Sequence, residues 1–220
     1  MIDAMNNSFF QFTAITAVFL SAVLLHITKR NSTAVSLYFI QSLAVAALLF
    51  RPLFENFSLA VLLMAGLTLA IKAAVAPLFF SRLIKRHQLK FSASTYLNTP
   101  LTLIVIAALA ALTNSRIFSH IASIDPDNKK ILGLAIAVIL VSFFLIINRK
   151  GAVSQIIGIL SLENGIVAFA LFSGLEQSPA LQIGVIFDLF VWVIIAAVFI
   201  SMIYKQFGSL DVTELKHLKE

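Results

Sequence analysis

Three ionisable residues, Lys72, Glu163 and Asp188, lie inside long apolar segments of the sequence. Water does not reach the middle of a bilayer, so an ionisable side chain at that depth is neutral, paired, or facing a wet cavity. Residues of this kind form proton relays in membrane proteins. A lysine able to pair with either carboxylate would complete an acid–base relay. The sequence therefore predicts a proton path through these three residues.

Glu163 lies near the middle of its segment, where its helical neighbours one turn away are Ile159, Leu160, Ile166 and Val167. These apolar residues offer no partner to a carboxylate. A partner must come from another helix, from water or from a second subunit. The alternative is a neutral glutamic acid that makes one interhelical hydrogen bond.

Asp188 is flanked one turn away by Gly184 and Trp192. The small Gly184, which we take as a supporting residue, leaves room for water or for an approaching helix. The alternative is an interfacial aspartate within reach of lipid headgroups, because only about two turns of helix separate Asp188 from its expected start.

Lys72 precedes Pro77 by five residues in an apolar segment. Because Pro77 has no N–H to donate to the carbonyl of Ala73, we expect a bent helix with a free acceptor near Lys72. Pro77 is therefore a second supporting residue. The alternative is that the lysine stem snorkels to the membrane interface. Asn164, next to Glu163, is the third supporting residue, although on its own it is typical of packing between helices, as Gln41 is.

The composition is that of an integral membrane protein. Of 220 residues, 60% are hydrophobic and only 12% are charged, against about 25% charged in soluble domains. The mean hydropathy is +1.00. There is no cysteine, which excludes disulfides, iron–sulfur clusters and cysteine-bound metals from this chain. No motif of metal-binding or nucleophilic spacing is present, so we expect no catalytic residue, no metal site and no cofactor in this chain.

We predict an all-α polytopic fold with about seven transmembrane helices. Each apolar segment is close to the roughly 20 residues needed to cross a bilayer. The first is expected to stay as a span, because residues 1–8 hold no Lys or Arg and so do not resemble a cleavable signal peptide. The predicted segments are about 9–27, 33–50, 58–80, 96–113 and 131–148, with two more inside 154–204 on either side of the link 174–179.

Basic residues predict the orientation. With the N-terminus outside, the inner loops and tail hold 11 of the 16 Lys and Arg residues and the outer connections hold 4. Because basic residues concentrate on the cytoplasmic side, we expect the N-terminus outside and the C-terminus inside. The net charge of +6 is thereby explained without nucleic acid. We divide the chain into a four-helix part (1–130), a three-helix part (131–204) and a cytoplasmic tail (205–220).

Several short stretches together resemble one known family. They are residues 162–165 (LENG), 184–188 (GVIFD) and 208–212 (GSLDV), together with Lys72 and Pro77 in IKAAVAPL. Their order and spacing over nearly the whole chain are similar to the E component of hydrogenase-4. That protein is a membrane subunit of group 4 nickel–iron hydrogenase and formate hydrogenlyase assemblies.

The last three predicted spans, within 131–204, also resemble the small K subunit of respiratory complex I and the matching subunit of Mrp-type antiporters. In that family two successive helices each carry an intramembrane glutamate on a lateral proton path. Glu163 matches the first of these glutamates. Asp188 falls where the second is expected, as an aspartate and after a shorter link.

The resemblance implies a non-redox membrane-arm subunit in the inner membrane of a prokaryote. Its partners would be antiporter-like membrane subunits and a peripheral hydrogenase module, which would hold the nickel–iron and iron–sulfur centres. Electron transfer there would drive protons, or Na⁺, past Lys72, Glu163 and Asp188. Two alternatives remain open: a scaffold subunit of the same complex with no ion path, and a free-standing ion-coupled transporter.

Overall fold

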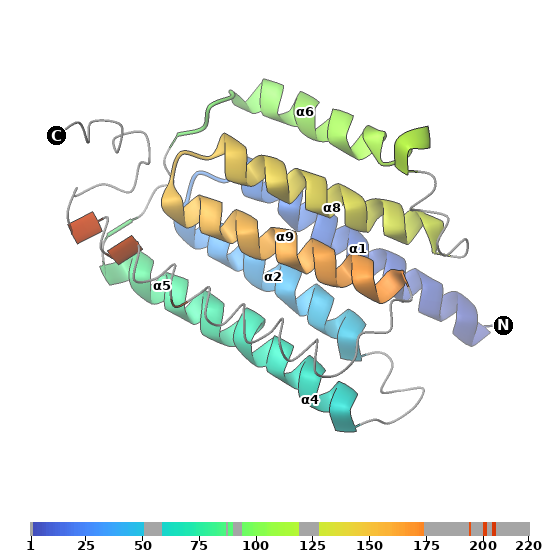
Figure 1. Ribbon diagram of the computed structural model, residues 1–220. Coiled ribbons are helices and arrows are strands. Elements are labelled where there is room, and N and C mark those ends of the chain that lie inside the picture. The colour runs from blue at the N-terminus through green and yellow to red at the C-terminus, as the bar shows by residue number, and fades with distance from the viewer. Residues whose placement is uncertain are drawn as a thin grey trace.

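A computed structural model describes residues 2–50, 59–86, 88–89, 94–118, 128–173, 194, 200–201 and 204–205. The predicted seventh span lies almost entirely outside these residues, and so do Gly184, Asp188 and the tail from residue 206. The described part is all-helical and contains no strand (Figure 1), which confirms the predicted fold class. Its helices are α1 (Ile2–Ile27), α2 (Asn31–Phe50), α4 (Leu59–Thr68), η1 (Leu69–Val75), α5 (Ala76–Arg86), α6 (Thr99–Leu112), α8 (Lys129–Asn148) and α9 (Ala152–Phe172).

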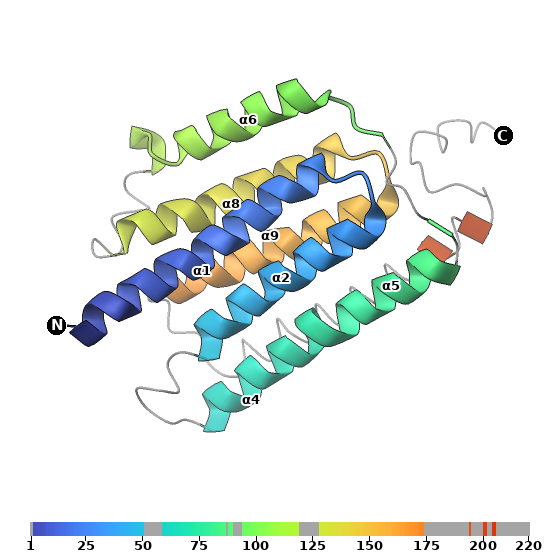
Figure 2. The ribbon, with the colours of Figure 1, turned by 180° about the vertical axis from the view of Figure 1, so that it is seen from behind.

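Five of the helical stretches are long and apolar enough to cross a membrane: Ser8–Ile27, Asn31–Phe50, Ala65–Arg86, Lys129–Asn148 and Ala152–Phe172. They correspond to five of the predicted segments, and the chain is a multi-pass membrane protein. Helices α4, η1 and α5 together form one continuous rod (Figure 2).

Helix α6 is shorter than the predicted fourth segment. It has 14 residues, which span about 21 Å, less than the roughly 30 Å of a hydrocarbon core. The reason is local. The Asn98 side chain accepts a hydrogen bond from the Leu101 N–H at 3.0 Å and so fixes the start of the helix, with Pro100 in its first turn. An asparagine at this position is a strong start signal.

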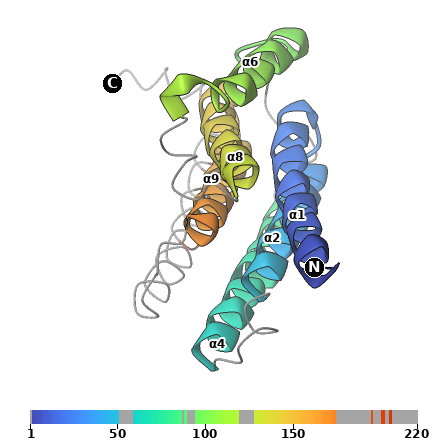
Figure 3. The same ribbon diagram turned by 90° about the vertical axis from the view of Figure 1, so that its right-hand side faces the viewer.

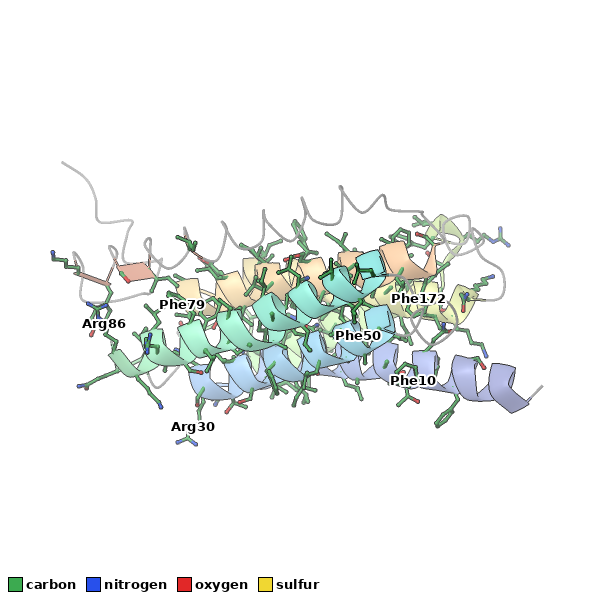
Figure 4. All side chains as sticks on the ribbon, turned by 90° about the horizontal axis from the view of Figure 1, so that it is seen from below. Phe10, Arg30, Phe50, Phe79, Arg86 and Phe172 are labelled. Atoms are coloured by element: carbon green, nitrogen blue, oxygen red, sulfur yellow. The ribbon has the colours of Figure 1, made fainter. Side chains whose placement is uncertain are left out.

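The helices lie in two rows. Viewed from the end, α1, α2 and α4 form one row, α8 and α9 form the other, and α6 lies against α8 at the edge (Figure 3). Helix α2 packs against α1, α9, η1 and α5, so it lies between the segment that carries Lys72 and the rest of the bundle. Arg30 and Arg86 are at the same end of the bundle (Figure 4), as expected if their two loops are on one side of the membrane.

Arg149 has a role that the charge count did not show. It was counted as a loop charge, yet it is 3% exposed. Its Nη2 donates hydrogen bonds to the carbonyl oxygens of Leu25, His26 and Thr28 at 2.7, 2.8 and 2.7 Å. The last carbonyls of a helix have no partner within the helix, so Arg149 satisfies two of those in α1, on Leu25 and His26, and ties α1 to the turn between α8 and α9. Burial lowers the pKa of the Arg149 guanidinium, but an arginine keeps its proton in proteins.

Two glycines allow α8 and α9 to pack closely. A Cβ on Gly158 would lie 2.8 Å from Cγ1 of Ile146, and one on Gly165 would lie 2.9 Å from Cγ1 of Val138 and 3.1 Å from the backbone nitrogen of Ile139. Small residues at such contacts are the usual means of close helix approach in membranes. This packing fixes the positions of Glu163 and Asn164 along the axis of α8.

Gly165→Ala is therefore expected to lower the free energy of unfolding by about 1–3 kcal/mol, the usual cost of overpacking. Thermal unfolding of the purified protein in detergent, followed by circular dichroism, measures this. Gly133→Ala on α8 is the matched control. A Cβ there meets nothing within 4 Å, so that variant should be neutral or slightly stabilised. Equal effects of the two substitutions would contradict the proposed close contact.

Candidate functional site

Lys72 lies in a π-helical stretch, η1, that runs over Leu69–Val75 and is followed by Pro77 in the first turn of α5. A regular α-helix would need a hydrogen bond from residue 77 to Ala73, which proline cannot donate. The sequence predicted a bend with a free acceptor. In the structure the irregularity takes the form of π-helical turns, in which hydrogen bonds join residues five apart. Such turns are often found at functional sites.

Lys72 and Glu163 form a buried ion pair. The distance from Nζ of Lys72 to Oε1 of Glu163 is 2.9 Å, and their side chains are 3% and 19% exposed. The partner that Glu163 lacks on its own helix thus comes from another helix, η1. Because Lys72 is buried with its amine in this contact, the structure excludes the alternative in which the lysine snorkels to the interface.

Burial of two charges is costly unless further hydrogen bonds support them. Asn164 provides one of these: Nζ of Lys72 donates to its Oδ1 at 3.2 Å. The side chain of Asn164 is fully buried. Consecutive residues of α9, Glu163 and Asn164, therefore hold the same ammonium group with a carboxylate and a carboxamide oxygen.

The hydrogen bonds continue from Asn164 into α2. Its Nδ2 donates to Oγ of Ser42 at 3.2 Å and to Oε1 of Gln41 at 3.4 Å. The Nε2 of Gln41 in turn donates to Oγ of Ser161 at 2.9 Å and to the carbonyl of Val18 at 3.3 Å. Every side chain named here except that of Val18 is polar, and all are buried.

The network ends on α8, where the hydroxyl groups of Ser142 and Ser161 are 2.7 Å apart. Ser142 and Ser161 are both fully buried. A polar network thus joins η1, α9, α2, α1 and α8 across the bundle. Gln41 was expected only to pack between helices and Asn164 to support Glu163, and nothing in the sequence indicates that these two amides are neighbours.

Tyr38 is a further buried residue at the site. It is fully buried on α2, one helical turn before Ser42. Tyr38 does not stand out in the sequence, because a tyrosine in an apolar helix is common. The only signal was its spacing from Gln41 and Ser42, which places all three on one face of the helix.

The structure brings together Lys72, Glu163 and Asn164, with Pro77 directly after the π-helical turns. Asp188 and Gly184 lie outside the described residues, so their place in the site stays a prediction. Within the described part of the chain, no three His, Cys, Asp or Glu side chains are arranged to hold a metal ion. The site is therefore a paired acid and base in an amide and hydroxyl network.

Comparison with known proteins gives two matches. A family model described as NADH-ubiquinone/plastoquinone oxidoreductase chain 4L matches residues 130–220. A protein of Mycobacterium tuberculosis named only as uncharacterized protein Rv0085 is 28% identical over 183 residues, which are 82% of each chain. No solved structure gives a significant match. The C-terminal part, which holds Glu163, thus resembles a membrane subunit of complex I.

Proposed function

We propose that this chain is a non-redox membrane-arm subunit of a group 4 hydrogenase, formate hydrogenlyase or related assembly, and that it takes part in moving protons or Na⁺ across the membrane. The observation that carries the ion-moving role is the 2.9 Å contact between Lys72 and Glu163 inside membrane-spanning helices. Ionisable residues are costly in this position and are usually functional.

The match of residues 130–220 to the chain 4L family supports a place in a complex I-like membrane arm. The resemblance of the LENG, GVIFD and GSLDV stretches to hydrogenase-4 component E supports the narrower assignment. The partners would then be antiporter-like membrane subunits and a peripheral module that holds the redox centres. The location would be the inner membrane of a prokaryote.

The pair has chemistry suited to this role. Its two ends can share one proton, because Nζ of Lys72 and Oε1 of Glu163 are within hydrogen-bond distance. Glu163 is the more exposed of the two, so we expect protons to enter and leave at its side. A change of charge in a neighbouring subunit would alter the preference of each site for the proton, which would couple a distant redox step to ion movement. Asp188 is the proposed next group on the path.

A scaffold role in the same complex is the second candidate. The observation that favours it is the network through Gln41, Asn164, Ser161 and Ser142, which joins several helices. Buried polar networks can fix a unique arrangement of helices. Under this role, a near-isosteric change at Glu163 would affect ion movement only as far as it reduces assembly or stability.

Partner identification tests the assignment to a complex. We expect the chain, purified from its native membrane in mild detergent, to carry antiporter-like subunits and a hydrogenase large subunit, identified by mass spectrometry, with hydrogen uptake or evolution in the same fraction. Co-purification of redox subunits of another kind would support the complex I-like role and contradict the assignment to a hydrogenase. A chain that elutes alone and monodisperse would reject both and favour a free-standing transporter.

A further inference from the structure

A chain of hydrogen bonds runs from Lys72 through Asn164 and Gln41, and in each of them the group nearer to Lys72 is the donor. An ammonium group has donors and no acceptor, so Asn164 must turn its Oδ1 toward Nζ, 3.2 Å away. That orientation points Nδ2 of Asn164 at α2, where it donates to Gln41 and Ser42. The charge on Lys72 therefore determines which way the Asn164 carboxamide faces.

Gln41 continues the series of hydrogen bonds with the same donor-to-acceptor order. Its Oε1 accepts from Asn164 at 3.4 Å, and its Nε2 therefore faces away, toward Oγ of Ser161 at 2.9 Å and the carbonyl of Val18 at 3.3 Å. Ser161 accepts from Gln41 and can donate to Ser142, 2.7 Å away. Aligned hydrogen bonds strengthen one another in a low-dielectric interior. This series of hydrogen bonds as a whole therefore favours a positive charge on Lys72.

The buried pair has two forms with the same total charge. In one, Lys72 is an ammonium and Glu163 a carboxylate. In the other, the proton has left Nζ and bonded to Oε1, which gives an amine and a carboxylic acid; no other reactant is needed. Burial favours the neutral form, because charges are costly in a low dielectric. Hydrogen bonds to the charged groups favour the ionised form.

We propose that Asn164 and Gln41 are positioning residues that keep the shared proton on Lys72 rather than on Glu163. Asn164 acts directly, by accepting from the ammonium. Gln41 acts through Asn164, by fixing the direction of its carboxamide. Neither carboxamide gains or loses a proton itself in the ordinary pH range. This inference rests on the proposed ion-moving role of the pair and assigns to the amides the control of its resting state.

Among the residues that the structure describes, the other ionisable groups around the pair do not provide this control. Among the described residues, α4 has no ionisable side chain, and the basic residues of α5 (Arg82, Lys85 and Arg86) are exposed. Helix α2 contributes Tyr38, which is fully buried one helical turn before Ser42. Phenols are neutral at physiological pH, so Tyr38 adds no charge that could hold the ammonium. In the described structure, Asn164 is thus the neutral residue that accepts a hydrogen bond from the Lys72 ammonium.

Infrared spectroscopy of the purified full chain in liposomes tests the proposal. The carbonyl stretch of a protonated Glu163 is identified as the carboxylic acid band that disappears when Glu163→Gln is added to the variant that shows it. In the unsubstituted protein at neutral pH we expect Glu163 to be a carboxylate. In Asn164→Leu, and less strongly in Gln41→Met, the acid band should appear, because the ammonium has lost support. A lost hydrogen bond to a charged group corresponds to a shift of about tenfold or more in the equilibrium between the two forms.

Ser36→Ala is the matched control. Ser36 is an exposed residue of α2 whose hydroxyl donates only to the Ser32 carbonyl one turn away, so the acid band should not appear. Thermal unfolding of each variant measures its stability, independently of whether the proton is on Lys72 or on Glu163. If Asn164→Leu fails to fold, Gln41→Met remains informative, since it leaves every direct contact of Lys72 in place.

The outcomes are distinct. Folded Asn164→Leu and Gln41→Met variants that are less stable but show no acid band would overturn the proposal and leave a packing role for the two amides. An unsubstituted protein in which Glu163 is already protonated at neutral pH would also overturn it. If no pH brings about any change in the Glu163 signal of the unsubstituted protein, the pair exchanges no proton, and the proposed function fails together with this inference.

Discussion

Lys72→Met is expected to destabilise the protein by about 3–5 kcal/mol, because removal of one member of a buried ion pair leaves the other charge uncompensated. The carboxylate of Glu163 would lose its partner at 2.9 Å, and Oδ1 of Asn164 would lose its donor. Methionine keeps most of the length and volume of the lysine stem, so loss of packing contributes little. The measurement is the unfolding free energy of the purified protein in detergent, compared with the unsubstituted chain.

A double-mutant cycle is the control for this prediction. The variant that combines Lys72→Met with Glu163→Gln should be more stable than Lys72→Met alone, since the stranded carboxylate is gone. The two substitutions are in direct contact and should be non-additive by about 0.5–3 kcal/mol. Additive effects would contradict the ion pair, whatever the size of each single effect.

Glu163→Gln is expected to reduce ion translocation by about 10²-fold or more, the usual range for removal of a proton-transferring group, while the chain stays in its complex. Glutamine has nearly the shape of glutamate and its oxygen can still accept from Lys72, but it cannot take up the proton. Fluorescence quenching of a pH-sensitive dye in inverted membrane vesicles measures translocation, and subunit composition measures assembly.

Glu163→Asp separates ionisation from shape in the same assay. It keeps a carboxyl group on a side chain that is one methylene shorter, so some translocation should return. If the aspartate and glutamine variants are equally impaired and both are poorly assembled, the scaffold role explains the site better than an ion path does.

Five of the predicted spans, and both members of the Lys72–Glu163 pair, could be predicted from the sequence. Long apolar segments defined α1, α2, α8 and α9, because about 20 apolar residues are needed to cross a bilayer and few other structures require them. Lys72 and Glu163 stood out for the same reason, since a charge inside such a segment is costly. The start of α6 was missed, because it is set by the capping side chain of Asn98 and not by the extent of the apolar segment.

The remaining parts of the site depend on tertiary contacts that a single sequence does not encode locally. Lys72 and Glu163 are 91 positions apart, and their pairing required the packing of η1, α2 and α9. Gln41 and Ser142 are uncharged residues in apolar helices, a type that usually only packs. Arg149 looked like a loop charge, and only its contacts with the end of α1 show a different role.

The most direct test of the account is the number of ions moved per electron pair by the purified complex in liposomes, with and without Glu163→Gln. We predict that the variant keeps its subunits and its electron transfer while this ratio falls by about 10²-fold or more. An unchanged ratio in a fully assembled variant would contradict a role of the Lys72–Glu163 pair in ion movement.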